Sequence, residues 1–102
     1  MSSEPKREEV EALPGRVVLE FGTSWCGHCR RAQPLIAEAL TAHPAVRHIK
    51  VEDGAGKRLG RSFQVKRWPT LVFLKDGKEA ARVVRPAASE EIGEALAAIE
   101  RA

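Results

Sequence analysis

The two cysteines of this chain are the residues whose type and spacing best allow chemistry. Cys26 and Cys29 are the only cysteines in 102 residues, and they are separated by Gly27 and His28. A disulfide between them would close a very short loop, and stabilisation by a disulfide grows with loop length. We therefore interpret the pair as a reactive dithiol and not as a structural bridge.

The dithiol lies where a predicted strand gives way to a predicted helix. The apolar run 17–21 predicts a buried strand that only Glu20 interrupts, and helical spacing begins just after Cys26. The start of a helix offers unpaired N–H groups and a positive dipole end, which stabilise a thiolate. A thiolate attacks disulfides, and one helical turn brings Cys29 close enough to resolve the mixed disulfide. A positive charge on His28 would favour the thiolate further.

Two other interpretations of the cysteines compete with redox chemistry. A zinc site needs four ligands, commonly two cysteine pairs or one pair with two histidines. His43 and His48 fall on other predicted elements than His28, so no second ligand pair is formed and we expect neither metal nor cofactor. The second alternative is a module that binds a partner in its groove without turnover.

Composition limits the class of protein. The chain has 43% hydrophobic and 30% charged residues with a net charge of +3, which is typical of one soluble domain over 1–102. Scattered basic residues and few aromatics argue against nucleic-acid binding. No apolar run approaches the ~18 residues of a membrane span, and the charged helical segment 1–15 is no signal peptide. We expect a cytoplasmic monomer without membrane contact.

The remaining pattern predicts an α/β fold. A βαβ unit followed by a β-hairpin and a helix implies a four-stranded mixed β-sheet with helices on both faces. Asp76-Gly77 between apolar runs is a strong hairpin signal, and Ser89 is the expected cap of the last helix. The expected elements are helix 4–13, strand 17–21, helix 26–43, strand 46–52, helix 57–63, strand 70–74, strand 79–84 and a helix after 89.

Four stretches in this order resemble the thioredoxin family. They are Val-Val-Leu-Glu-Phe (17–21), Trp-Cys-Gly-His-Cys (25–29), Trp-Pro-Thr-Leu-Val-Phe (68–73) and Lys-Asp-Gly-Lys (75–78). The resemblance implies a thioredoxin fold and a thiol–disulfide oxidoreductase that acts on disulfide-containing proteins or small thiols and is recharged by an upstream reductase. The first strand of the family has no counterpart before residue 17.

The resemblance also implies roles for individual residues. Cys26 would be the exposed nucleophile and Cys29 the buried resolving thiol. Pro69 would be cis, which places the backbone of Trp68 opposite the dithiol, where an extended substrate segment pairs with it. Trp25 and Gly27 belong to the same substrate-facing loop.

A proton relay is implied as well. Glu20 matches the family's buried carboxylate, which exchanges a proton with the resolving thiol, and burial should raise its pKa. His48 or Lys50 lies where the family places the basic partner of that carboxylate, and the register between them stays open.

Three departures from the family pattern bear on which substrate or partner the protein takes and not on the chemistry of the dithiol. Gly27-His28 between the cysteines resembles protein disulfide isomerase, which suggests a less reducing dithiol and an oxidase or isomerase alternative. Trp68 is bulkier than the usual residue before the cis-proline. Arg85-Pro86 stands where thioredoxins have a glycine-containing loop beside the substrate groove. Reduction of disulfides is the expected direction.

Overall fold

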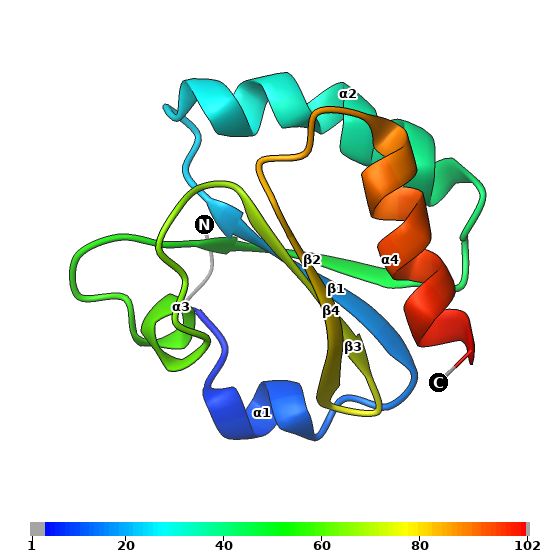
Figure 1. The fold of residues 1–102 in the computed structure, drawn as a ribbon. Helices are drawn as coiled ribbons and strands as arrows, with labels where there is room; N and C mark the ends of the chain where they lie inside the picture. Colours follow the sequence, from blue (N-terminus) through cyan, green and yellow to red (C-terminus); the bar gives the residue numbers. More distant parts are fainter. Residues whose placement is uncertain (1–3, 102) are drawn as a thin grey trace.

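The computed structural model describes residues 4–101, which form four helices and four strands (Figure 1). The elements are α1 (Arg7–Glu11), β1 (Arg16–Gly22), α2 (Gly27–Thr41), β2 (Arg47–Glu52), α3 (Arg58–Ser62), β3 (Thr70–Lys75), β4 (Lys78–Val84) and α4 (Ser89–Arg101). No helix in this range combines the length and apolarity needed to cross a membrane.

The strands form one mixed sheet in the order β2-β1-β3-β4. β1 pairs in parallel with β2 and antiparallel with β3, and β3 pairs antiparallel with β4. The predicted four-stranded mixed sheet is therefore confirmed. β1 lies inside the sheet and is buried from Val17 to Phe21, so any side chain at its carboxyl end is held by neighbours on both sides.

Helices cover both faces of the sheet, as predicted. Successive residues of β1 point to opposite faces, which divides the core into two clusters. Leu19 and Phe21 pack with residues of α1 and α3, whereas Val18 packs with residues of α2 and α4. By the same alternation Glu20 emerges on the face that α2 covers, which is why the helix carrying the dithiol can reach it.

The N-terminal segment differs from the predicted helix 4–13. α1 begins only at Arg7, because the Glu4 carboxylate accepts hydrogen bonds from the amides of Arg58 and Leu59 at 3.0 and 3.5 Å and so caps α3 instead. The Lys6 amide donates to Glu9 Oε1 at 2.8 Å, which closes the start of α1. Between residue 4 and β1 the structure shows no strand.

The capping prediction for the last helix is wrong. Ser89 is the first residue of α4, and its hydroxyl donates to Glu38 Oε2 at 3.2 Å. The Glu91 carboxylate accepts the amides of Ala87 and Ala88 instead, at 2.6 and 3.0 Å. These two amides lie before the helix, so the Glu91 carboxylate closes the start of α4 in the way of the acidic member of a capping box.

Candidate active site

The two cysteines lie at the N-terminus of α2. Cys26 has extended backbone angles (φ −80°, ψ 121°) and occupies the cap position, where its Sγ accepts a hydrogen bond from the Cys29 amide at 3.2 Å. Both thiols are free and buried, with Cys26 7% and Cys29 4% exposed. The expectation of an exposed Cys26 is therefore wrong, because the sulfur turns back over the helix end to meet that amide.

The environment of Cys26 favours its thiolate. Burial alone would raise the pKa of this thiol. Hydrogen bonds from the Cys29 side chain and from the backbone amides of Cys29 and His28, together with the charge of Arg85, outweigh burial and lower the pKa below its ordinary value. The backbone amides at the start of α2 therefore favour the Cys26 thiolate, as predicted.

His28 does not supply the predicted positive charge. The Arg85 guanidinium, partial desolvation and Arg31 all lower the pKa of His28, in that order of importance. Its Nδ1 lies 2.9 Å from Nη2 of Arg31, one helical turn away. Cations on both sides disfavour protonation of the imidazole, so the charge that favours the thiolate comes from Arg85.

The pKa of the Cys29 thiol is shifted in the opposite direction from that of Cys26. Burial, the hydrogen bond with Cys26 and the charges of Cys26 and Glu20 raise the pKa of the Cys29 thiol to about 11. The thiolate is thus favoured at Cys26, whereas Cys29 stays protonated at neutral pH. Within residues 4–101, no three His, Cys, Asp or Glu side chains are grouped as metal ligands would be.

Alkylation should separate the two thiols. At neutral pH we expect iodoacetamide to modify Cys26 and to leave Cys29 almost untouched, because only the thiolate reacts. The rate at Cys26 should be constant above its lowered pKa and fall about tenfold for each pH unit below it. Mass-spectrometric mapping of the modified peptide over pH measures this. A midpoint at the ordinary thiol pKa of about 8.5 would instead favour the binding-module interpretation.

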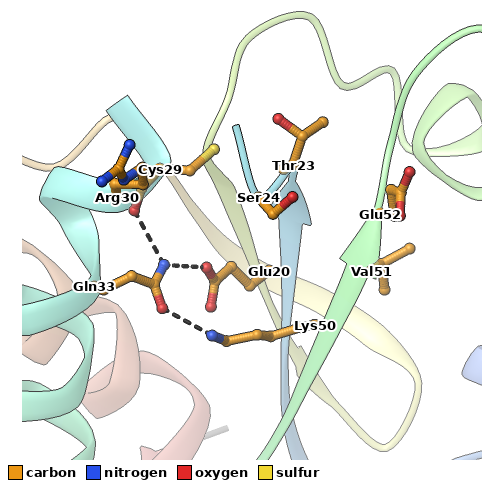
Figure 2. A pocket seen from close by; sticks show the side chains of 10 residues that line it. Glu20, Thr23, Ser24, Cys29, Arg30, Gln33, Lys50, Val51 and Glu52 are labelled. Atoms are coloured by element: carbon orange, nitrogen blue, oxygen red, sulfur yellow. Dashed lines mark hydrogen bonds between the residues drawn. The ribbon is translucent and has the colours of Figure 1, made fainter. Parts of the chain in front are cut away.

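A network of polar side chains surrounds Glu20, which is buried with 6% exposure. Its Oε1 lies 2.7 Å from His48 Nε2, and its Oε2 accepts a hydrogen bond from Gln33 Nε2 at 2.7 Å. Lys50 Nζ donates to Gln33 Oε1 at 2.9 Å and so reaches the carboxylate only through the amide, as Figure 2 shows. Of the two predicted basic partners, His48 is therefore the direct one.

The predicted rise in the pKa of Glu20 is wrong. Burial does raise it, but the hydrogen bonds from His48 and Gln33 and the charges of His48 and Lys50 lower the pKa below its usual value. Glu20 is therefore an ionised carboxylate at neutral pH.

A cavity of about 240 Å³ connects this carboxylate with the Cys29 thiol. Glu20, Cys29 and Gln33 line it together with Thr23 and Lys50 (Figure 2). Sequence analysis missed Gln33, which also donates to the Cys29 carbonyl at 3.0 Å. A polar residue four positions after Cys29, on the buried face of a helix, was the signal that could have revealed it.

The segment before β3 faces the dithiol loop. The Trp68–Pro69 peptide bond is cis, as the resemblance implies. The Trp25 ring, 72% of whose residue surface is exposed, meets the Trp68 ring edge-on at 5.6 Å between centroids and 81° between planes. The Trp68 indole donates to Asp53 Oδ2 at 2.9 Å, which fixes its orientation. The two indoles thus pack against each other beside the loop that carries Cys26.

Arg85 contacts the Trp68–Pro69 segment from the connection between β4 and α4. It has a left-handed backbone (φ 49°), and its amide donates to the Pro69 carbonyl at 3.0 Å. Its Nε donates to the Trp68 carbonyl at 2.8 Å, so a side chain of this chain already binds the backbone group that the resemblance assigns to substrate. Gly27 is exposed as the first residue of α2.

Comparisons with known proteins agree with this geometry. A family profile described as thioredoxin matches residues 2–98. The chain is 43% identical to thioredoxin H-type 1 of Nicotiana tabacum over 68 aligned residues. The aligned region covers 67% of this chain and 54% of that protein. The chain spans little more than half the length of several such plant relatives.

Similar solved structures cover more of the chain than these relatives do. Reduced thioredoxin 2 of Pseudomonas aeruginosa is 52% identical and superposes with a TM-score of 0.85 over 100% of both chains. A thioredoxin of Nicotiana alata is 28% identical, with a TM-score of 0.71 over 92% of this chain and 93% of that one. The fold is the thioredoxin fold, its Cys26–Cys29 pair fits the active-site motif, and the chain belongs to the thioredoxin family.

Proposed function

We propose that this chain is a thiol–disulfide oxidoreductase that reduces disulfides in protein or small-molecule substrates through Cys26 and Cys29. The observation that carries the proposal is the opposite tendency of the two thiols at the start of α2: the pKa of Cys26 is lowered and that of Cys29 is raised to about 11. Membership of the thioredoxin family supports it.

The reaction proceeds in two exchanges. The Cys26 thiolate attacks one sulfur of the substrate disulfide, and the other sulfur leaves as a thiolate that takes up a proton. Cys29 then loses its proton and attacks Cys26 Sγ, which releases the second substrate thiol and leaves a Cys26–Cys29 disulfide. Two electrons pass from the dithiol to the substrate. An upstream reductase returns the pair to the dithiol.

Glu20 acts as the base in the second exchange. Its carboxylate is ionised, and the cavity that it shares with Cys29 is large enough to hold water that carries the proton. His48 and Gln33 hold the carboxylate in place. The pair Trp25 and Trp68, with Pro69, Gly27 and Arg85, forms the surface that receives the substrate.

Removing the base should slow resolution and leave attack intact. In Glu20→Gln we expect the mixed disulfide to decay on the order of 10²-fold more slowly, because the Cys29 proton has lost its acceptor. Stopped-flow measurement of both exchanges separates the steps, and Glu94→Gln, an exposed carboxylate on α4 that does not line this cavity, is the matched control. Equal slowing of both exchanges would show a structural effect only. A normal decay in Glu20→Gln would remove Glu20 from the mechanism.

Insulin reduction tests the proposed function. With dithiothreitol as electron source, the wild-type chain should accelerate precipitation of the insulin B chain, and Cys26→Ser should return the rate to the background. Dithiothreitol stands in for the natural reductase, so the assay needs no partner. Equal turnover by both proteins would overturn the proposal.

An oxidase or isomerase is the second candidate, because stabilising the Cys26 thiolate also stabilises the reduced dithiol and makes the disulfide more oxidising. Equilibration with glutathione buffers gives the reduction potential. A value near ~−270 mV supports the reductase and a value near ~−180 mV supports the alternative. The cytoplasmic location fits the reductase and stays a prediction.

A further inference from the structure

We propose that Arg85 and Arg31 form a carboxylate-binding subsite beside the dithiol, which favours disulfide substrates that carry a carboxylate close to the disulfide. This inference rests on the proposed oxidoreductase function and names the substrate class that the site prefers.

The subsite is a hollow of about 350 Å³ between α2 and the connection from β4 to α4. His28 and Arg31 line it from the first turns of α2, and Arg85 and Pro86 line it from the connection. Figure 1 shows this connection, in orange, rising from the sheet to the level of α2. Since His28 lines the hollow two residues after Cys26, groups that flank a disulfide at Cys26 come close to it.

The Arg85 guanidinium is held in position before any substrate binds. Its Nε donates to the Trp68 carbonyl at 2.8 Å, and its amide donates to the Pro69 carbonyl at 3.0 Å. The side chain is thus anchored through Nε, and its terminal nitrogens make no hydrogen bond within the described residues. A positioned guanidinium loses less conformational entropy when it binds an anion than a freely rotating one does.

The positive charge of the hollow has no acidic partner in the described part of the chain. The ion pairs found within residues 4–101 involve other basic side chains, and none includes Arg31 or Arg85. Arg85 also influences both Cys26 and His28 electrostatically, which places its charge near the reacting sulfur. An anion brought there by the substrate would meet two uncompensated cations.

A carboxylate is the anion that fits this arrangement. Guanidinium groups bind carboxylates through paired N–H···O bonds, and Arg31 and Arg85 approach the hollow from opposite sides. Carboxylates occur beside disulfides in two sources, the small tripeptide glutathione and proteins with an acidic residue next to the reacting cysteine. Both present the same chemistry to the subsite.

Reduction rates for disulfides of different charge test the proposal. We would measure second-order rate constants of the reduced protein with oxidised glutathione (anionic), bis(2-hydroxyethyl) disulfide (neutral) and cystamine (cationic). Arg85→Gln should slow oxidised glutathione about threefold to tenfold more than the neutral disulfide, and it should favour cystamine relative to the neutral one. Arg31→Gln should shift the ratios in the same direction. Ratios cancel any change in the reactivity of Cys26 itself.

The control variant is Lys78→Gln. It removes the same charge from the first residue of β4, at the opposite end of that strand from Arg85, and should leave all three ratios unchanged. A matched pair of cystine peptides, flanked by Glu or by Gln, distinguishes the sources. Sensitivity of the Glu peptide to Arg85→Gln indicates protein substrates, whereas sensitivity of glutathione alone indicates the small disulfide.

Two failures remain distinguishable. Equal slowing of all three disulfides by Arg85→Gln, or the same selectivity change in Lys78→Gln, would overturn the subsite and leave the oxidoreductase function standing. No reaction of the wild-type protein even with the neutral disulfide would overturn the proposed function itself.

Discussion

The Cys29→Ser variant is expected to stop turnover and to accumulate as a mixed disulfide between Cys26 and its substrate. The first exchange needs only the Cys26 thiolate, which the helix amides and Arg85 still stabilise. The second exchange needs a thiol at position 29, and a serine hydroxyl cannot attack a disulfide. With pre-reduced protein and no dithiothreitol, release of the fully reduced substrate should slow by about three orders of magnitude, because no thiol of the variant can then resolve the mixed disulfide.

Non-reducing mass spectrometry checks this result directly. The variant incubated with a disulfide substrate should gain the mass of one substrate half, and dithiothreitol should release it. Cys26→Ser is the matched control, since it keeps a single thiol whose pKa is raised to about 11 in the intact pair. An adduct on Cys29 in that control, formed as quickly as on Cys26, would contradict the assignment of the nucleophile. In cell extract the mixed disulfide formed by Cys29→Ser would identify the physiological substrate.

Gly77→Ala is expected to destabilise the fold by about 3 kcal/mol, the largest loss that we predict for an exchange of so few atoms. Asp76 and Gly77 form the β3–β4 turn with φ values of 50° and 83°, a pairing typical of tight hairpins. A side chain at Gly77 would be strained in this region and would also overlap the backbone carbonyl of Glu11 at the end of α1. Backbone cannot rotate away as a side chain can, so α1 or the turn must move.

A second glycine isolates the two causes. Gly15 has a φ of 76°, yet a Cβ there would meet no atom within 4 Å. Gly15→Ala therefore measures the left-handed strain alone, about 1–2 kcal/mol. Urea unfolding of both variants gives the difference, which is the cost of the contact with α1. Equal losses would mean that α1 leaves the turn without cost and does not support the hairpin.

Local patterns were sufficient for much of the fold and for the dithiol. The strand 17–21, the hairpin at Asp76 and the position of Cys26 at a helix start each depend on neighbours in sequence, and each is confirmed. The four-stranded sheet followed from the order of elements, because a βαβ unit and a hairpin can join in few ways.

The site was less predictable where distant residues decide its electrostatics. Burial of Glu20 was visible in the sequence, but its lowered pKa depends on His48 from the neighbouring strand and on Gln33 from the helix above. His28 lost its expected charge because Arg85 lies close in space. These corrections share one cause: the sign of a pKa shift reflects the sum of burial, hydrogen bonds and charges, and only the folded chain sets that sum.

The contact between Trp25 and Trp68 gives the protein an optical reporter. The chain has two tryptophans and no tyrosine, so nearly all of its ultraviolet emission arises from indoles that touch each other beside the dithiol. Fluorescence should therefore follow events at Cys26 with little background from the rest of the domain. A change in the colour or lifetime of this emission when disulfide forms would let the exchange be timed in the unlabelled, unmodified protein.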